Sequence, residues 1–397
     1  MARGYNRLPL AAALLAAASS ASAAIVIPAG DWTLEVGGFQ NMYYTHTKTS
    51  SADAANTMGT GLLPNNLSFT GKTRQNDLDV SFTTSFFTGS SSGSNTGAGA
   101  GLAGNTLNIR QAFLTFGDKT WGTVKIGRDL GVFGSDAILS DMTLLGVGSM
   151  YAPGGSSTLG RIGAGYIYAD WWGQMQYQSP SFGGFQVTAA AIEPISNGSN
   201  ANTDLGFQAK ATYDFAANDV TGRVWVGATT QKQDSVAAVA AVANTSTVVG
   251  GTTGSATVAA KPGYTSRGYE LGAKASVAGF DVVAYGYSGD GLSGAAGVVN
   301  GVMYKSGTQS DDNGGYVQAT YKLPTIGTKL GASWGQNNTT ANNSNNKYTT
   351  ESWIVGVYHP LTKSLNLVAE YSDGEHQLNS TATTTVKTTS LGAILFF

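Results

Sequence analysis

Apolar and polar residues alternate along much of this chain in short segments separated by polar gaps. In residues 205–215, for example, Phe207 and Tyr213 fall on one face, whereas Gln208 and Thr212 fall on the other. A period of two residues is typical of a β-strand with one apolar and one polar face, and helical periodicity is hard to find. The pattern therefore predicts an all-β protein.

Sixteen such segments can be placed along the chain. They cover residues 31–45, 62–71, 77–87, 106–117, 121–128, 165–178, 185–193, 204–214, 220–231, 266–277, 280–289, 314–322, 329–337, 349–358, 364–373 and 384–397. An even number of antiparallel strands returns both chain ends to the same side of a barrel. The sequence predicts a sixteen-stranded antiparallel transmembrane β-barrel.

The gaps between the segments alternate in length, which supports this fold class. Those after odd-numbered segments are long and rich in Gly, Ser, Thr and Asn: 46–61, 88–105, 129–164, 194–203, 232–265, 290–313, 338–348 and 374–383. Those after even-numbered segments are short, for example 117–120 and 278–279. Long extracellular loops and short periplasmic turns are the layout of an outer-membrane barrel.

The gap after the fifth segment is unusual in both length and charge. It spans residues 129–164, far more than the roughly 12–15 residues at which an unstructured connection becomes uncommon. It carries Asp129, Asp136 and Asp141 before its first basic residue, Arg161. We therefore expect this third loop to fold into the lumen and narrow a pore.

Residues 1–23 have the features of a secretory signal peptide. Arg3 and Arg7 precede an apolar run, Leu8–Ala18, and the small residues that end at Ala23 provide a cleavage site. The run is shorter than the roughly 20 residues that a membrane-spanning helix needs. We expect an exported protein whose barrel domain covers residues 24–397.

The amino-acid composition also supports an exported barrel. Only 12% of the residues are charged, against roughly 25% in a typical soluble chain, and the chain has no cysteine. A chain with 54 glycines, no cysteines for disulfides and no apolar helix in its exported part fits an outer-membrane barrel. Without the two arginines of the signal peptide, 20 basic residues stand against 24 acidic ones, so no nucleic-acid partner is expected.

The last segment ends on an aromatic residue. Leu391, Leu395 and Phe397 fall on one face of residues 384–397. An isolated edge strand of this kind would invite aggregation, so pairing with the first strand is the natural arrangement. Phe397 is also similar to the terminal signal that barrel-assembly machinery recognises.

Several segments together resemble the sixteen-stranded general porins of Gram-negative bacteria. They are Leu34-Glu-Val-Gly-Gly-Phe39, Arg110-Gln-Ala-Phe113, Trp121-Gly-Thr-Val-Lys-Ile-Gly-Arg128, Tyr177-Gln-Ser-Pro-Ser-Phe-Gly-Gly-Phe185 and the terminal Phe397. The resemblance implies a water-filled channel for passive diffusion of small hydrophilic solutes and ions. It also implies a homotrimer in the outer membrane, in contact with lipid and lipopolysaccharide.

The resemblance further implies acids on the inward loop opposite basic residues on the wall. Arg110 occupies the position of the wall arginine and Asp141 that of a constriction acid, so we expect the two to face each other. Apolar Leu144 and Leu145 stand where a further acid is expected. The other residues expected at the constriction are Asp129, Asp136, Arg161 and Asp170.

Alternation places Arg110 on the polar face of its strand, opposite Ile109 and Phe113. Charged residues on the polar faces of other strands are expected to line the lumen: Lys125, Lys210, Arg223, Glu270, Lys274 and Glu370. Arg161 is compatible with a wall contact or with an ion pair inside the loop.

Three other functions remain compatible with the sequence. A substrate-selective porin for carboxylates, sugars or phosphate would have the same fold. An outer-membrane enzyme would need catalytic groups, but His46, His359 and His376 lie in predicted loops or turns without metal or nucleophile-and-base spacing. An adhesive barrel would use the apolar loop at 236–260. We expect no catalytic residue, no metal and no cofactor.

Overall fold

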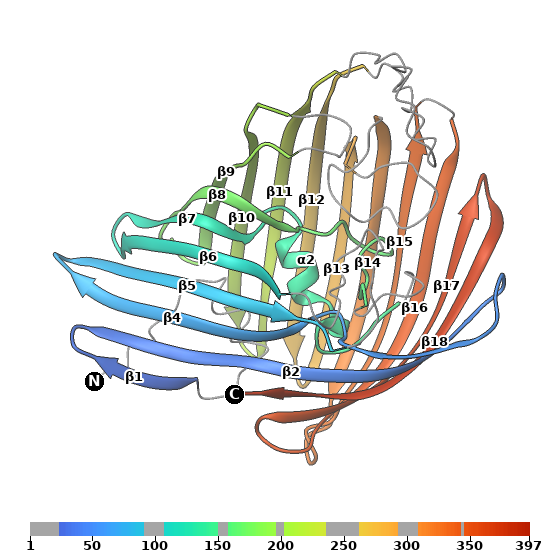
Figure 1. The fold of residues 1–397 in the computed structure, drawn as a ribbon, viewed down its shortest axis with the longest axis horizontal. Coiled ribbons are helices and arrows are strands. Elements are labelled where there is room, and N and C mark those ends of the chain that lie inside the picture. Colours follow the sequence, from blue (N-terminus) through green and yellow to red (C-terminus); the bar gives the residue numbers. More distant parts are fainter. Residues whose placement is uncertain are drawn as a thin grey trace, which may run out of the picture.

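The computed structural model describes residues 24–90, 107–149, 158–195, 202–235, 262–292, 309–342 and 345–397. The predicted signal peptide and the apolar loop at 236–260 lie outside these residues. Sixteen long strands form one antiparallel sheet that closes on itself (Figure 1). The predicted fold class is confirmed.

The strands of the barrel are β2 (Trp32–Thr49), β4 (Asn65–Gln75), β5 (Leu78–Thr88), β6 (Leu107–Asp118), β7 (Gly122–Leu130), β8 (Trp171–Gln178), β9 (Phe185–Ile192), β10 (Gly206–Ala217), β11 (Val220–Gln233), β12 (Tyr264–Val277), β13 (Phe280–Asp290), β14 (Ser310–Lys322), β15 (Lys329–Ala341), β16 (Lys347–Pro360), β17 (Leu365–Leu378) and β18 (Thr381–Phe396). Two short strands, β1 (Ile25–Ala29) and β3 (Ala55–Gly59), add to β2. Sequence alternation did not reveal either of them.

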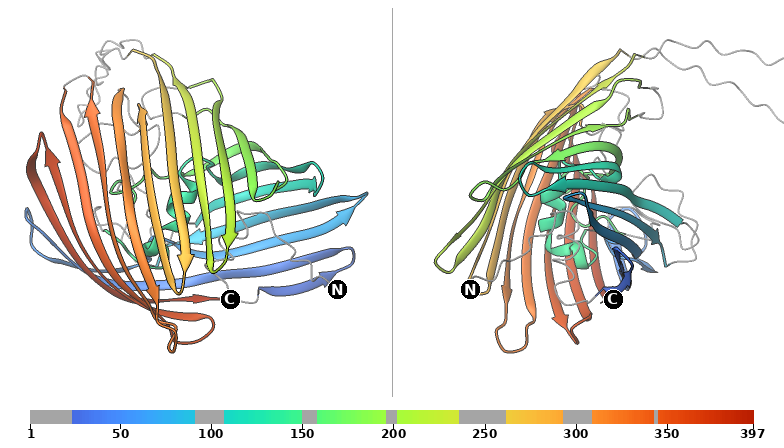
Figure 2. Two further views of the ribbon diagram at one scale, coloured as in Figure 1. Left: turned by 180° about the vertical axis from the view of Figure 1, so that it is seen from behind. Right: turned by 90° about the vertical axis from the view of Figure 1, so that its left-hand side faces the viewer.

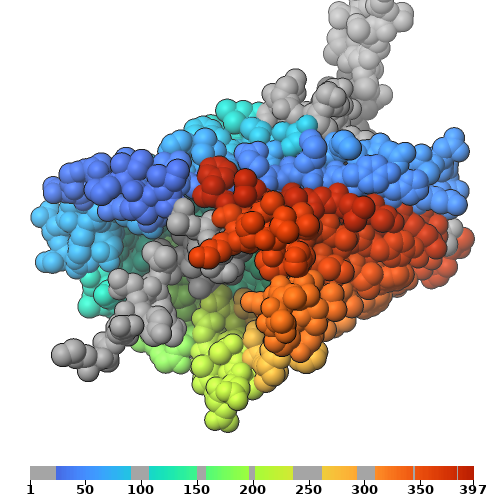
Figure 3. Space-filling view, turned by 90° about the horizontal axis from the view of Figure 1, so that it is seen from below, coloured from blue at the N-terminus to red at the C-terminus, as the bar shows by residue number. Residues whose placement is uncertain are grey.

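The barrel closes where the last strand meets the first. β18 pairs with β2 from Val386↔Thr49 to Phe396↔Phe39, and Figure 3 shows the N-terminal and C-terminal strands in direct contact. Backbone hydrogen bonds between Gly38 and Phe397 continue this pairing, at 2.9 and 3.1 Å. Closure gives each strand two neighbours, so no edge is left open in the wall.

The apolar faces of the strands point outward, as the alternation predicted. Phe207 and Tyr213 are 56% and 48% exposed, whereas Gln208 and Thr212 are 2% and 4% exposed. In a soluble protein the apolar face would be buried, but in a membrane it contacts lipid and the polar face lines the lumen.

Most connections follow the predicted order of long loops and short turns. Asn76 and Asp77, both with positive φ, form a two-residue turn between β4 and β5. The eighth long gap is an exception, because Asn379 and Ser380 form an equally tight turn between β17 and β18. The predicted loop at 374–383 is therefore wrong, since both strands continue to that turn.

The third loop is longer than the sequence predicted. β7 continues to Leu130, and β8 begins at Trp171 instead of residue 165. The loop contains the helix α2 (Ser135–Ser140) and the 3-10 helix η1 (Met142–Leu145). We call residues 131–149 and 158–170 the inner loop, because α2 lies inside the ring of strands in the ribbon views (Figures 1 and 2).

Among the described residues, no helix has both the length and the apolar composition needed to span a bilayer.

Candidate functional site: the inner loop and the opening beside it

The inner loop divides the lumen into two unequal sides. One side consists of β10–β17, whose inward side chains bind the loop; we call it the loop-bearing wall. The other side consists of β4–β9, which faces a remaining space; we call it the open wall. The chemistry of the inward residues differs between the two walls.

Two glutamates of the loop-bearing wall bind backbone amides of the inner loop. Glu370 Oε2 on β17 accepts hydrogen bonds from the amides of Val147 and Gly148 at 2.8 and 2.7 Å. Glu270 Oε2 on β12 accepts one from the amide of Gly134 at 3.0 Å. Both glutamates are 4% exposed. Buried carboxylates need such donors, so each glutamate holds a turn of the loop against the wall.

Carboxamides of the same wall bind further loop amides. Gln208 Oε1 on β10 accepts from Val132 and Phe133 at 2.7 and 3.1 Å. Gln318 on β14 both accepts from the Met142 amide and donates to the Ser140 carbonyl, at 2.7 and 3.0 Å. These bonds satisfy backbone groups of a loop that has little regular secondary structure of its own.

The fit between loop and wall leaves no room for a side chain at Gly146. A Cβ atom there would lie 2.0 Å from Oε1 of Glu370. The carbonyl of Gly146 also accepts a hydrogen bond from the amide of Leu62, at 2.9 Å, in the first loop. Glycine at this position lets the chain approach the wall closely.

Asp136 ties the loop to basic side chains of the wall. Its carboxylate contacts Lys210 Nζ at 2.5 Å and Arg223 NH1 at 3.1 Å, and Arg223 also binds Asp214 at 2.6 Å. Burial opposes the charge on Asp136, but the attraction of Lys210 and Arg223 outweighs it and lowers its pKa below the ordinary value. Lys274 lies beside this group, opposite Arg223 in the β11–β12 pairing.

Arg161 and Asp141 are buried in the contact between loop and wall. Arg161 is fully buried and donates to Ser333 Oγ at 2.5 Å and to the Ser352 carbonyl at 3.2 Å, which is a wall contact. Asp141 accepts from the Tyr166 hydroxyl at 2.7 Å and caps η1 through the amide of Thr143 at 2.9 Å. Burial lowers the pKa of Arg161, and nearby Asp141 acts in the opposite direction.

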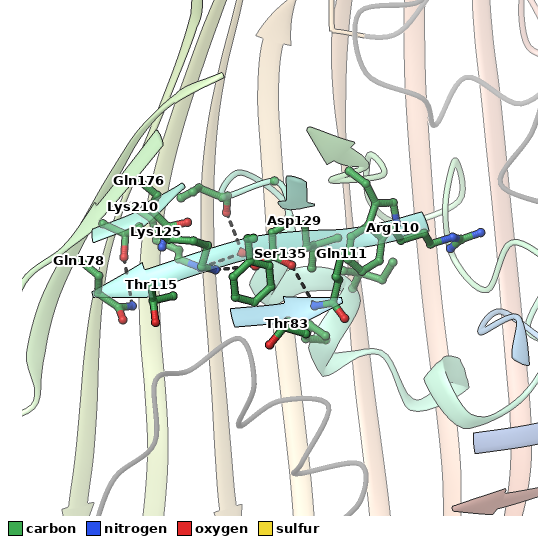
Figure 4. Close-up of a pocket in the computed structure, with 18 of the residues that line it drawn as sticks. Thr83, Arg110, Gln111, Thr115, Lys125, Asp129, Ser135, Gln176, Gln178 and Lys210 are labelled. Atoms are coloured by element: carbon green, nitrogen blue, oxygen red, sulfur yellow. Dashed lines mark hydrogen bonds and ion pairs between the residues drawn. The ribbon is translucent and has the colours of Figure 1, made fainter. Parts of the chain in front are cut away.

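A space lies between the inner loop and the open wall, and we call it the opening (Figure 4). It measures about 1570 Å³, including its exit to solvent. Its charged lining residues are Lys72, Arg110, Lys125, Asp129 and Lys210. Asp129 belongs to the end of β7, not to the loop as predicted, and accepts from Lys125 at 2.5 Å and Gln111 at 3.0 Å.

A β-bulge decides which side chains of β6 face this opening. The pairing of β5 with β6 shifts between Ser85 and Phe86, so that Arg110 is left without an opposing residue in the ladder. Arg110 and Phe113 consequently both line the opening, although alternation had placed them on opposite faces. The guanidinium carbon of Arg110 lies 5.1 Å from the ring centre of Phe87 and 5.9 Å from that of Trp171.

The structure therefore separates the residues expected at the constriction. Arg110 and Asp129 line the opening, whereas Asp136, Asp141 and Arg161 lie in the contact between loop and wall. Asp170, with φ of 53°, caps the Trp171 amide where the loop rejoins β8. Asp141 and Arg110 have different partners, in contrast to the facing pair inferred from the sequence.

The lumen residues inferred from the sequence also divide between the two roles. Lys125 and Lys210 line the opening, Arg223 and Lys274 stand behind Lys210, and the two glutamates hold the loop. Sequence reasoning missed Gln208 and Gln318, whose only signal was a polar residue on an inward strand position. Among the described residues, no cluster of three or more acidic or histidine side chains could hold a metal ion.

Comparison with known proteins identifies the family to which this barrel belongs. The sequence profile of Gram-negative porins matches residues 10–377, which is most of the chain. The chain belongs to the Gram-negative porin family. This porin is thus a channel of the outer membrane.

Solved structures share the fold at low sequence identity. The outer membrane channel DcaP of Acinetobacter baumannii has a TM-score of 0.63 at 15% identity, covering 93% of this chain and 99% of its own. An anion-selective porin from Comamonas acidovorans has a TM-score of 0.61 at 13% identity, covering 92% and 100%. In-vitro folded OmpT of Vibrio cholerae, in its trimer form, has a TM-score of 0.58 at 15% identity, covering 92% and 99%. No curated protein sequence matches the chain.

Proposed function

We propose that solutes cross this porin through the opening between the inner loop and the open wall, by passive diffusion. The observation that carries this proposal is the attachment of the loop to the opposite wall through Gln208, Glu270, Gln318 and Glu370. A loop held at so many points has a fixed position, so it acts as a constant constriction and requires no moving gate.

The charged lining favours anions in this passage. Lys72, Arg110, Lys125 and Lys210 contribute four cations to the lining, and Asp129 contributes one carboxylate. Opposite charges attract most strongly at short range, where salt screens them least. We therefore favour anion preference over the cation preference that a constriction acid at Asp141 would give.

Shortening the loop tests the route. Replacing residues 135–147 by a short Gly-Ser linker removes α2 and η1 and should raise single-channel conductance in KCl about twofold or more. The variant should also admit larger sugars in liposome-swelling assays. Unchanged conductance in a correctly folded variant would show that the loop does not limit the passage.

We further propose that residues 1–23 are removed on export and that the mature chain forms a homotrimer without enzymatic activity or cofactor. The trimer form described for the similar OmpT structure supports this assembly. N-terminal sequencing should begin near Ala24, and SDS gels should show a trimer until the sample is heated. Lipopolysaccharide and lipid are the proposed contacts of the outer face.

The terminal residue is proposed to serve barrel assembly. Phe397 pairs with Gly38 through two backbone hydrogen bonds at the seam of the barrel. Deleting Phe397 should lower the amount of protein in the outer membrane, while the channels that do assemble should keep normal conductance. Wild-type membrane levels of the deletion variant would contradict this role.

A further inference from the structure

We propose that the opening binds small carboxylates that carry an aromatic ring, of which benzoate is the simplest, as they cross. This inference rests on the proposed route and names the class of solute that the lining fits. Three features of the opening carry it: an excess of cations, aromatic rings beside those cations, and an aliphatic face on the loop.

The first feature is the balance of charge. Among the described residues that line the opening, Asp129 is the only acid. Three carboxylates stand behind the lining: Glu35 binds Lys72, Asp136 binds both Lys210 and Arg223, and Asp214 binds Arg223. Including these, the acid Glu270 near Lys210, and the second-row cations Arg223 and Lys274, six cationic side chains face five acidic ones. A carboxylate is therefore attracted into the opening.

The second feature is the contact between cations and rings. Arg110 lies over the rings of Phe87 and Trp171, and Lys125 Nζ lies 4.9 Å from the ring centre of Phe113. Figure 4 shows Lys125 and Lys210 at one end of the opening and the guanidinium of Arg110 extending toward the other. A carboxylate that reaches either end brings its attached group against an aromatic side chain, where offset or edge-on ring contacts are favourable.

The third feature is the face that the inner loop presents. Ile138, Leu139, Leu144 and Ile162 line the opening from the loop, together with Leu130 at the end of β7. Of the loop acids, Asp136 is bound by Lys210 and Arg223, and Asp141 accepts a hydrogen bond from Tyr166. A solute in the opening thus has cations on the wall side and aliphatic groups on the loop side.

These features discriminate between classes of solute. A small inorganic anion would contact the cations but would leave the apolar side chains exposed to water. A sugar would bring hydroxyl groups against aliphatic side chains without replacing their hydrogen bonds to water. An aromatic carboxylate fits both sides of the opening. Its carboxylate contacts the cations of the wall, and its ring packs on the aliphatic side chains and removes their apolar surface from water.

Binding can be measured as block of the chloride current through single channels in planar bilayers. We expect benzoate to reduce the current at about tenfold lower concentration than acetate, because only benzoate buries a ring. Benzamide, which has the ring without the charge, should bind more weakly than benzoate. Equal block by benzoate and acetate, or by benzoate and benzamide, would overturn the inference and leave the channel function intact.

Two pairs of variants locate the site. Leu139→Ser, on the partly exposed loop face, should weaken the block by benzoate about threefold and leave that by acetate unchanged. Its control is Ile326→Ser, which changes an apolar residue in a periplasmic turn that is 55% exposed. Arg110→Gln should weaken the block by both anions, with Arg74→Gln at the periplasmic rim as its control.

The outcomes separate this inference from the proposed route. If Leu139→Ser and Ile326→Ser bind benzoate equally well, the ring does not contact the loop and the inference fails. If the wild-type chain conducts no KCl, the proposed function fails, and the inference fails with it. KCl conductance with selective block by benzoate that Leu139→Ser weakens is the result we expect.

Discussion

The inward polar residues of the two walls of the lumen have different partners. The loop-bearing wall presents acceptors, above all Glu270 and Glu370, and these are used by amides of the inner loop. The open wall presents cations beside aromatic rings, as at Arg110 and Lys125, and these face the space that remains. An inward charged residue in a barrel can therefore hold the constriction in place, as Glu370 does, or face the solute, as Arg110 does; Lys210 does both, because it binds Asp136 and lines the opening.

Removing an acceptor from the loop-bearing wall should have the largest effect on the channel. Glu370→Leu leaves the amides of Val147 and Gly148 and the hydroxyl of Tyr358 without their partner. Each unsatisfied buried donor costs about 1–3 kcal/mol, so we expect the loop to detach locally. The single-channel conductance should rise and the current should fluctuate more. Hydrogen exchange of the amides of residues 147 and 148 should become faster.

Glu370→Gln is the matched control, because its remaining oxygen can still accept hydrogen bonds. We expect it to show a smaller rise in conductance than Glu370→Leu. Quiet, wild-type currents in a folded Glu370→Leu channel would mean that Glu370 does not hold the loop.

A smaller effect is expected from removing a cation of the open wall. Arg110→Gln takes away one of the four basic side chains in the lining. The reversal potential under a KCl gradient should shift toward lower anion preference, by about twofold in the permeability ratio, because salt at 0.15 M screens charges beyond about 8 Å. Arg74→Gln, whose side chain is 48% exposed at the periplasmic rim, should leave the potential unchanged.

The smallest effect on selectivity is expected at Asp141. Asp141→Asn keeps a side-chain oxygen near Tyr166 and Thr143, and the residue lies away from the lining of the opening. The reversal potential should stay within error of the wild type. A clear rise in anion preference would place Asp141 in the passage and contradict the assignment.

Much of the fold could be predicted from the sequence, because alternation is strict where one face contacts lipid. Phe207 and Gln208 show this on β10, and the outward Leu391 shows it on β18. The ends of strands were predicted less well. Residues 165–170 look extended and apolar, yet they belong to the inner loop, since strand character alone does not show whether a partner strand is available.

Some residues of the site could be predicted from the sequence, but the pairs of side chains that contact each other could not. The length of the third loop indicated an inward position, and Arg110 and Asp129 do line the opening. The bulge that brings Phe113 to the same side as Arg110 adds one residue to a ladder, which alternation cannot reveal. The partners of Asp136 and Asp141 depend on how the loop folds in three dimensions, and no local pattern encodes that.

In the proposed channel, the passage runs along the open wall and the inner loop covers the other wall. Because the chain has no cysteine, single substitutions can report on each wall separately. Ser81 on β5 lines the opening, whereas Ser333 on β15 is bound by Arg161 beneath the inner loop. A charged thiol-specific reagent should reduce the current of Ser81→Cys and leave that of Ser333→Cys unchanged. Rapid modification of Ser333→Cys, with no effect on Ser81→Cys, would contradict the account.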